Sequence, residues 1–186
     1  RNISGKDPFA PAKWNDFQSA VRNGFGELSQ CSEAVSALEK LNGFRVLCVL
    51  RKGPYGTESL NEYIKRLLGK KCPMPVMITR NDHSLEVQNG DVGVVIPDEP
   101  QYIYLPTLEK GVRKLRLELL NGTELAFATT IHKAQGSEFG NVSIVMPPEA
   151  DLPLLTREIL YTGITRTKGA IRIYAGEASI KACCEK

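Results

Sequence analysis

Phe44-Arg45-Val46-Leu47-Cys48-Val49-Leu50 is the stretch that decides the fold of this chain of 186 residues. Its nearly continuous apolar character is typical of a parallel strand that is buried on both faces. The strand ends at the turn-forming run Arg51-Lys52-Gly53-Pro54-Tyr55-Gly56. A helix is expected next, beginning behind Ser59, whose partner Glu62 completes a capping box, and ending at Gly69. Strand, turn and helix form an α/β unit, and ligands of such sheets bind at the carboxyl ends of the strands.

Upstream of this strand the pattern is weaker. Residues 1–28 contain several prolines and glycines, and we interpret them as a linker with one short helix around Trp14–Val21. A second helix is expected before the strand, because apolar residues recur at helical spacing and Asn42-Gly43 follows them as a stop signal. The apolar residues of this helix are Ala34, Val35, Leu38 and Leu41.

Downstream of Cys72 the sequence becomes rich in short β-like runs, several of them separated by turn signals such as Asn89-Gly90 and Asn121-Gly122. Runs of this number and length predict a small barrel or a curled sheet. The α/β pattern then resumes, with strands expected at Val142–Met146 and Ile171–Tyr174. A β insertion within an α/β domain explains this order. The β-like runs are Val76–Thr79, Val92–Ile96, Tyr102–Leu105, Leu115–Leu119 and Leu125–Ala128.

The composition is that of an ordinary globular protein, with 42% hydrophobic residues, 24% charged residues and a net charge of +3. No apolar run approaches the roughly 20 residues that span a bilayer. The five cysteines are scattered and include no Cys-x-x-Cys pair, which argues against a fully paired disulfide framework and against a zinc site. We therefore expect a cytoplasmic protein without a metal site of its own.

The segment Ala128-Thr129-Thr130-Ile131-His132-Lys133-Ala134-Gln135-Gly136-Ser137-Glu138-Phe139 carries the densest chemistry. Gly136 allows the backbone to approach a phosphate closely. Thr130, His132 and Ser137 can donate hydrogen bonds to phosphate oxygens, a kind of contact that positions a nucleic acid strand without reading its sequence. In these residues the chain resembles helicase motif V, in the form found in RecD-type DNA helicases of superfamily one (the exodeoxyribonuclease V alpha subunit).

Three further segments resemble the same family, in the family's order. Thr156-Arg157-Glu158-Ile159-Leu160-Tyr161-Thr162-Gly163-Ile164-Thr165-Arg166-Thr167-Lys168 is similar to helicase motif VI, with Gly163 and Thr167 where the family usually has alanine. The run 49–56, followed by Leu60-Asn61, looks like motif IV. The stretch 75–82, continued by Asn89-Gly90-Asp91-Val92-Gly93, resembles the segment that leads into an inserted SH3-like barrel.

The resemblance implies a role for each matched residue. Arg166 would be the arginine finger that reaches the ATP γ-phosphate across a domain cleft, and Arg51 a second phosphate sensor. Gly136 and Glu138 would lie at the nucleotide. Single-stranded DNA would be contacted by Thr130, His132, Lys133, Gln135 and Ser137.

It also implies an architecture and a set of partners. A RecA-like second motor domain, 2A, would comprise residues 29–80 and 125–186, with the SH3-like barrel, 2B, inserted at 81–124. Residues 1–28 would be the tail of a first motor domain that binds most of the ATP and Mg²⁺. The intact protein would move 5′ to 3′ on DNA in double-strand break repair and recombination, and could bind the nuclease and helicase subunits of a RecBCD-type complex.

The sequence contains no G-x-x-x-x-G-K-[ST] phosphate-binding loop, so this chain alone is expected to be inactive as an ATPase. Two alternatives stay open. The chain could be a non-catalytic module that docks a helicase onto partner subunits, or the second domain of a relaxase or viral helicase. The runs Arg-Lys-Gly-Pro-Tyr-Gly and Asn-Gly-Asp-Val-Gly favour the RecD type over the latter.

Overall fold

A computed structural model of the chain describes residues 11–107, 111–149 and 151–185. The chain divides into two compact units, which are described separately below. The first unit contains residues up to Gly24, residues Gly43–Leu60 and residues from Ala128 onward. The second unit contains Phe25–Asn42 and Asn61–Phe127.

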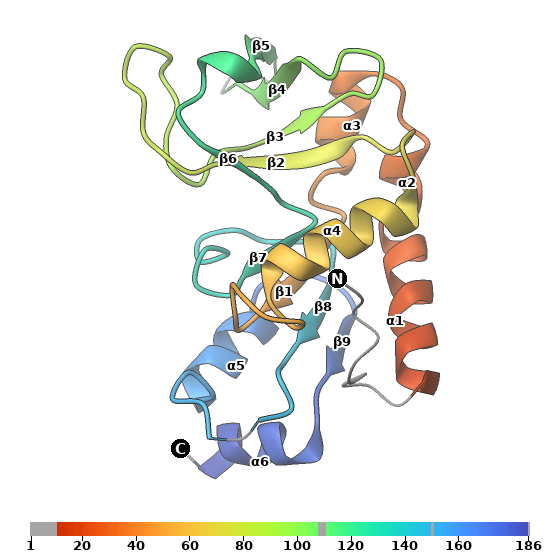
Figure 1. Cartoon of the computed structure of the whole chain (residues 1–186), viewed down its shortest axis with the longest axis vertical. Helices are drawn as coiled ribbons and strands as arrows, with labels where there is room; N and C mark the ends of the chain where they lie inside the picture. Colours follow the sequence, from red (N-terminus) through yellow and green to blue (C-terminus); the bar gives the residue numbers. More distant parts are fainter. Residues whose placement is uncertain (1–10, 108–110, 150, 186) are drawn as a thin grey trace. The chain divides into compact units, whose positions relative to one another are not determined.

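The first unit is built on a parallel sheet with the strand order β7-β1-β8-β9 (Figure 1). The strands are β7 (Ala128–Thr130), β1 (Phe44–Cys48), β8 (Asn141–Val145) and β9 (Ile171–Tyr174). Every residue of β1 is buried, and β1 pairs in parallel with both β7 and β8. The predicted buried parallel strand is therefore confirmed, and with it the α/β class of the fold.

Three helices belong to this unit: α1 (Pro11–Gly24), α5 (Arg157–Ile164) and α6 (Glu177–Glu185). The segment expected to be mainly a linker is thus largely helical, and its helix is longer than predicted. Phe17 of α1 is fully buried, and its ring packs edge-on against the ring of Tyr174, with centroids 5.1 Å apart. The Tyr174 hydroxyl donates a hydrogen bond to Asp16 at 2.8 Å. These contacts make α1 part of the core of the unit.

Helix α4 (Thr57–Leu68) begins earlier than the sequence predicted. Ser59 lies inside its first turn and is not its cap. Carbonyls just after β1 accept the first helical amides instead: Thr57 N donates to Leu50 O and Glu58 N to Arg51 O, both at 3.1 Å. The predicted end is confirmed, because Gly69 follows the last turn with a φ of +84°, a conformation that favours glycine.

The second unit contains an antiparallel sheet with the strand order β5-β4-β3-β2-β6. Its strands are β2 (Met74–Ile78), β3 (Val92–Val95), β4 (Tyr102–Pro106), β5 (Val112–Arg116) and β6 (Thr123–Leu125), with the short helix η1 (Leu117–Leu119) after β5. Buried apolar side chains from β2, β3 and β4 form the core of the unit, and partly buried ones from β5 and β6 pack against them. The expected β-rich insert is thus present.

The insert is larger than the sequence suggested. Strand β2 lies before the expected boundary at residue 81, yet it pairs with β3 on one side and β6 on the other. Helices α2 (Gly26–Ser29) and α3 (Ala34–Lys40) also belong to this unit. The predicted apolar face of α3 is partly wrong, because Val35 is 52% exposed while Ala37 and Leu41 are buried.

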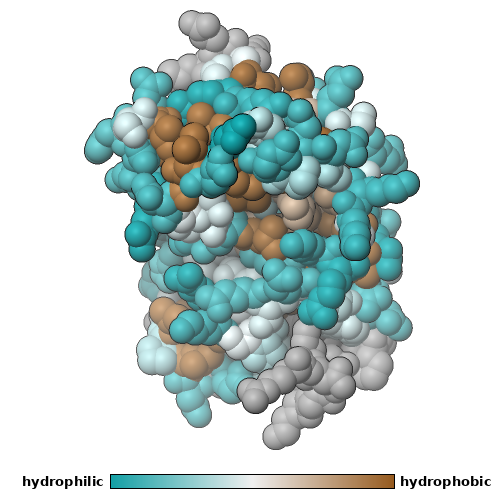
Figure 2. Space-filling view, turned by 45° about the horizontal axis from the view of Figure 1, so that its top comes forward, coloured by the Kyte–Doolittle hydropathy of each residue, from teal (hydrophilic) through white to brown (hydrophobic). Residues whose placement is uncertain are grey.

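The surface in Figure 2 is mostly hydrophilic and is interrupted by apolar patches. Among the large apolar side chains that are exposed, Tyr161 and Ile164 lie on α5. Within the described residues, no helix has the length and apolar character needed to cross a membrane.

Candidate functional site

The segment after β7 alternates between anchoring and exposed side chains. Ile131, Ala134 and Phe139 are buried in the core of the first unit. The side chains between them reach solvent, and they are the residues selected from the sequence: His132, Lys133, Gln135, Gly136, Ser137 and Glu138. Thr130 is half-buried, and its hydroxyl accepts a hydrogen bond from Lys133 N at 3.3 Å. Apolar residues thus fix the backbone of this segment, while its polar side chains reach solvent.

This segment runs alongside β1 from one end of the strands to the other. The side of the sheet at which the parallel strands end is called the carboxyl edge, and the side at which they begin is called the amino edge. At the start of the segment, Ile131 N donates to Cys48 O, at the carboxyl end of β1. At its end, Asn141 N donates to Gly43 O, which precedes the amino end of β1. A five-residue strand spans about 16 Å at ~3.3 Å per residue. Thr130, His132 and Lys133 therefore lie toward the carboxyl edge, and Ser137 and Glu138 toward the amino edge.

Arg166 lies at the amino edge, just beyond α5. Helix α5 is capped at its start by Thr156, whose hydroxyl accepts a hydrogen bond from Ile159 N at 3.3 Å. Beyond its other end, the carbonyl of Arg166 accepts a hydrogen bond from Phe139 N at 2.8 Å, and Phe139 lies two residues before β8. The structure thus joins the two segments that resemble motifs V and VI.

The Arg166 guanidinium is held by neutral oxygens. It donates to Thr162 O at 3.1 Å, to Ser137 O at 3.3 Å and to the Thr165 hydroxyl at 3.1 Å. Two backbone carbonyls and a hydroxyl orient the group without cancelling its charge. A guanidinium has five N–H donors, so this arrangement leaves capacity for an anion such as a phosphate.

Glu138 and Lys168 form an ion pair beside Arg166, with Oε2 and Nζ 2.7 Å apart. The hydrogen bond from Lys168 and its positive charge lower the pKa of Glu138. The backbone reinforces the same contact, because Lys168 N donates to Phe139 O at 2.9 Å. Arg166, Glu138 and Ser137 are thus brought together at the amino edge.

Arg51 lies elsewhere. It follows β1 at the carboxyl edge, and its Nε donates to Glu58 Oε1 at 3.1 Å, with both side chains more than half exposed. The turn that carries it is tight, because a Cβ on Gly56 would lie 2.5 Å from the carbonyl oxygens of Arg51 and Lys52. The two arginines selected from the sequence are therefore at opposite edges of the sheet. Arg51 also faces a carboxylate, whereas the recorded acceptors of Arg166 are neutral.

Gly163, which departs from the usual alanine of the family, fits its surroundings. A Cβ there would lie 2.8 Å from Ile144 Cδ1 and 3.1 Å from Ile131 Cδ1. Helix α5 thus packs closely over β8 and over the segment that follows β7.

A shallow groove of about 200 Å³ lies beside the polar segment. His132 and Gln135 line one side, and the start of α5 with the residues before it lines the other. The remaining lining residues are Pro153, Leu154, Thr156, Glu158, Ile159 and Thr162.

Sequence reasoning missed Arg45. This residue lies in the middle of β1 and is only 2% exposed, and its guanidinium carbon is 4.9 Å from the centroid of the Phe139 ring. One signal could have identified it, because Arg45 is the one charged residue in the apolar run 44–50.

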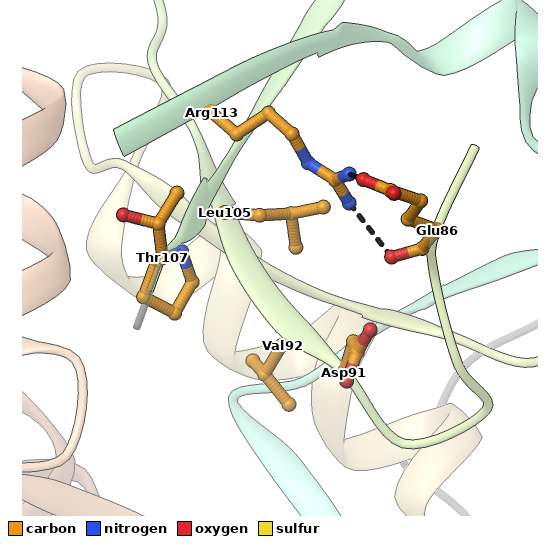
Figure 3. A pocket seen from close by; sticks show the side chains of 7 residues that line it. Glu86, Asp91, Val92, Leu105, Thr107 and Arg113 are labelled. Carbon is orange, nitrogen blue, oxygen red and sulfur yellow. Dashed lines mark hydrogen bonds and ion pairs between the residues drawn. The ribbon is translucent and has the colours of Figure 1, made fainter. Parts of the chain in front are cut away.

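The second unit has a pocket of about 350 Å³, shown in Figure 3. Arg113 donates to the carbonyl of Glu86 at 3.0 Å and approaches its carboxylate at 3.5 Å. Val92, Leu105 and Pro106 supply apolar surface, and Asp91 adds a second carboxylate. Two carboxylates and one guanidinium give this pocket a net negative charge, so it is poorly suited to bind phosphate. Within the described residues, no group of three or more His, Cys, Asp or Glu side chains is arranged to hold a metal ion.

Known helicases are similar to this chain in sequence. Residues 125–174 match the family described as the UvrD-like helicase C-terminal domain. The RecBCD enzyme subunit RecD of Mycolicibacterium smegmatis is 36% identical over 164 residues, 81% of this chain and 28% of that protein. The corresponding subunit of Haemophilus influenzae is 33% identical over 74% of this chain and 22% of its own length.

Two further proteins are also similar to this chain. The ATP-dependent RecD2 DNA helicase of Deinococcus radiodurans is 34% identical over 73% of this chain and 20% of that protein. Among solved structures, Bacteroides Pif1 bound to single-stranded DNA aligns with 91% of this chain and 50% of its own, at 17% identity and a TM-score of 0.44. The chain thus spans less than a third of the length of these RecD relatives. In sequence it is similar to RecD-type helicases, and its residues 125–174 match a helicase C-terminal domain.

Proposed function

We propose that this chain acts as the second motor domain of an ATP-dependent DNA helicase, supplying single-stranded DNA contacts and an arginine finger to ATP that is bound mainly by a phosphate-loop domain. The observation that carries the proposal is the Arg166 guanidinium, oriented by neutral oxygens at the amino edge and joined there to the segment 128–139. Such a group is positioned in advance to stabilise charge on a transferred phosphoryl group.

The amino edge is the nucleotide side in this proposal. Arg166 would reach the γ-phosphate, Glu138 would face the ribose, and the φ of +83° at Gly136 would let the backbone approach closely. Ser137, expected from the sequence to contact DNA, belongs with this group because its carbonyl holds Arg166. The chain offers Mg²⁺ no carboxylate cluster within the described residues, so the metal would be held with ATP by the phosphate-loop domain.

The carboxyl edge is the DNA side. Thr130, His132, Lys133 and Gln135 would contact the strand, with the groove beside His132 next to its path. The role expected for Arg51 changes, because Arg51 and Arg166 cannot readily meet one phosphate from opposite edges of a sheet about 16 Å tall. We assign Arg51 to the DNA backbone. Its exposed ion pair with Glu58 would open at little cost.

The finer features follow from the family resemblance. Travel would be 5′ to 3′, the antiparallel sheet of the second unit would close into an SH3-like barrel that helps hold or separate the strands, and the intact protein would serve double-strand break repair and recombination. Docking onto nuclease or helicase subunits is the second candidate. The net negative pocket of the second unit favours a protein partner over DNA at that surface.

Binding of single-stranded DNA to the purified chain, followed as salt is raised, tests the proposal. We expect affinity to fall steeply, because cations that neutralise phosphates release counterions, and we expect no DNA-stimulated ATP turnover by the chain alone. Robust turnover by the chain would contradict an incomplete ATP site. Absence of DNA binding at low salt, together with tight binding of a nuclease subunit, would favour the docking function.

A further inference from the structure

Arg45 occupies an unusual place for a charged side chain. It is the second residue of β1, it pairs in register with Val142 of β8, and it is 2% exposed. Burial lowers its pKa to about 10, so the guanidinium remains protonated at neutral pH. A buried charge is costly, and replacing one with an apolar side chain of similar volume is often neutral or stabilising. A guanidinium buried at this position is therefore expected to make specific contacts.

The guanidinium of Arg45 lies over the aromatic ring of Phe139. The guanidinium carbon lies 4.9 Å from the centroid of the Phe139 ring, within the range of a cation–π interaction, which is strongest when the pair is desolvated. Phe139 is itself 4% exposed. The arginine therefore restrains the position of this ring more specifically than an apolar neighbour would.

Phe139 is the point at which the two functional segments are joined. Its N–H donates to Arg166 O at 2.8 Å, and its carbonyl accepts from Lys168 N at 2.9 Å. Phe139 directly follows Glu138, which forms an ion pair with Lys168. A shift of the Phe139 ring would therefore displace the backbone from which Arg166 extends.

We propose that Arg45 is a positioning residue: by packing its guanidinium on Phe139 it fixes the junction between residues 137–139 and 166–168, and with it the place of Arg166. The structural step is independent of the helicase mechanism. Only the consequence for ATP turnover rests on the proposed function.

Amide hydrogen exchange in the 186-residue chain tests the structural step with the variant Arg45→Met. We expect the amides of Phe139 and Lys168 to exchange about ten-fold faster or more, which corresponds to ~1.4 kcal/mol. The amides of Ile131 and Met146, bonded to Cys48 O and Tyr174 O at the other edge of the sheet, should keep their rates.

Two variants serve as controls. Arg45→Lys keeps a cation that can lie over the ring, and it should restore part of the protection at Phe139. Arg172→Met removes the same group from an exposed position on β9 and should leave all four amides unchanged. If Arg45→Met does not fold, Phe139→Leu tests the same contact from its other side and should give the same local pattern.

Unchanged protection at Phe139 and Lys168 would overturn the proposal, as would a uniform loss of protection at all four amides. In the intact helicase, Arg45→Met should lower kcat for ATP about ten-fold, with KM and DNA affinity unchanged, as for an interaction made only in the transition state. Local exchange without a fall in kcat would leave the positioning role standing and would instead refute the role of Arg166 at the nucleotide.

Discussion

The two edges of the parallel sheet carry residues from the same short segment, yet they are built differently. At the amino edge, Arg166 is bonded to three oxygens, and Glu138 is paired with Lys168. At the carboxyl edge, His132 and Lys133 are exposed side chains on a backbone anchored by buried apolar residues. Side chains fixed by hydrogen bonds suit a reaction whose rate depends on the position of the reacting groups. Exposed side chains suit the reversible binding of a DNA backbone.

The charges differ in the same way. Arg166 is oriented by neutral acceptors, while Arg51 at the other edge already faces the carboxylate of Glu58. Two arginines that look equivalent in the sequence thus differ in both their place and their neutralisation. If the difference between Arg166 and Arg51 separates nucleotide chemistry from DNA binding, substitutions of the two arginines should have different effects.

The largest expected effect is on ATP turnover. Under the proposed function, Arg166→Ala in the full-length protein should lower DNA-stimulated kcat by about three to five orders of magnitude, the loss typical of an arginine finger, with DNA affinity nearly unchanged. Arg51→Ala should instead weaken DNA binding and leave kcat at saturating DNA within a few-fold of the parent, ~1 kcal/mol or less. Steady-state ATPase kinetics at several DNA concentrations measure both.

Equal losses of kcat in the two variants would show that both arginines act on the nucleotide. Glu58→Gln is the matched control for Arg51. It frees the Arg51 guanidinium from its carboxylate partner, and it should strengthen DNA binding slightly while leaving kcat unchanged.

A smaller effect is expected on DNA affinity. Lys133→Ala should reduce the slope of log affinity against log salt by about 0.7, the value for one phosphate contact on a single strand. His132→Ala should weaken binding several-fold, about the ~1 kcal/mol of one hydrogen bond, with an unchanged slope. Lys168→Ala, at the opposite edge, is the control cation. A loss of slope in that variant equal to the loss in Lys133→Ala would show that DNA crosses both edges.

The sequence predicted the elements that depend on local pattern. The run 44–50 is the buried strand, Gly69 ends α4, and the residues selected at 130–138 reach solvent while their apolar neighbours are buried. Each of these follows from periodicity or from turn chemistry within one segment.

Long-range contacts decided what the sequence could not predict. Strand β2 joined the antiparallel sheet because β3 and β6, remote in sequence, pair with it. The separation of Arg51 from Arg166 depends on the path of the segment 131–139 along β1, and the role of Arg45 depends on where Phe139 comes to lie. The spacing of residues within a single segment of sequence does not determine how far apart these side chains lie in the fold.

The smallest effect concerns the ion pair at the amino edge and its pH dependence. Lys168 lowers the pKa of Glu138 in the folded chain, so the pair stabilises the fold above the ordinary glutamate range of about 4.3, and this stabilisation is lost as the pH falls through the lowered pKa. Lys168→Met should therefore reduce the thermal midpoint slightly at about pH 7, and the difference from the parent should vanish as the pH falls through the lowered pKa of Glu138. NMR titration of Glu138 should show its pKa rising in the variant. If the pKa stays low without Lys168, the charge of Arg166 would have to hold it there, and that charge would then be less available to a phosphate than its neutral acceptors indicate.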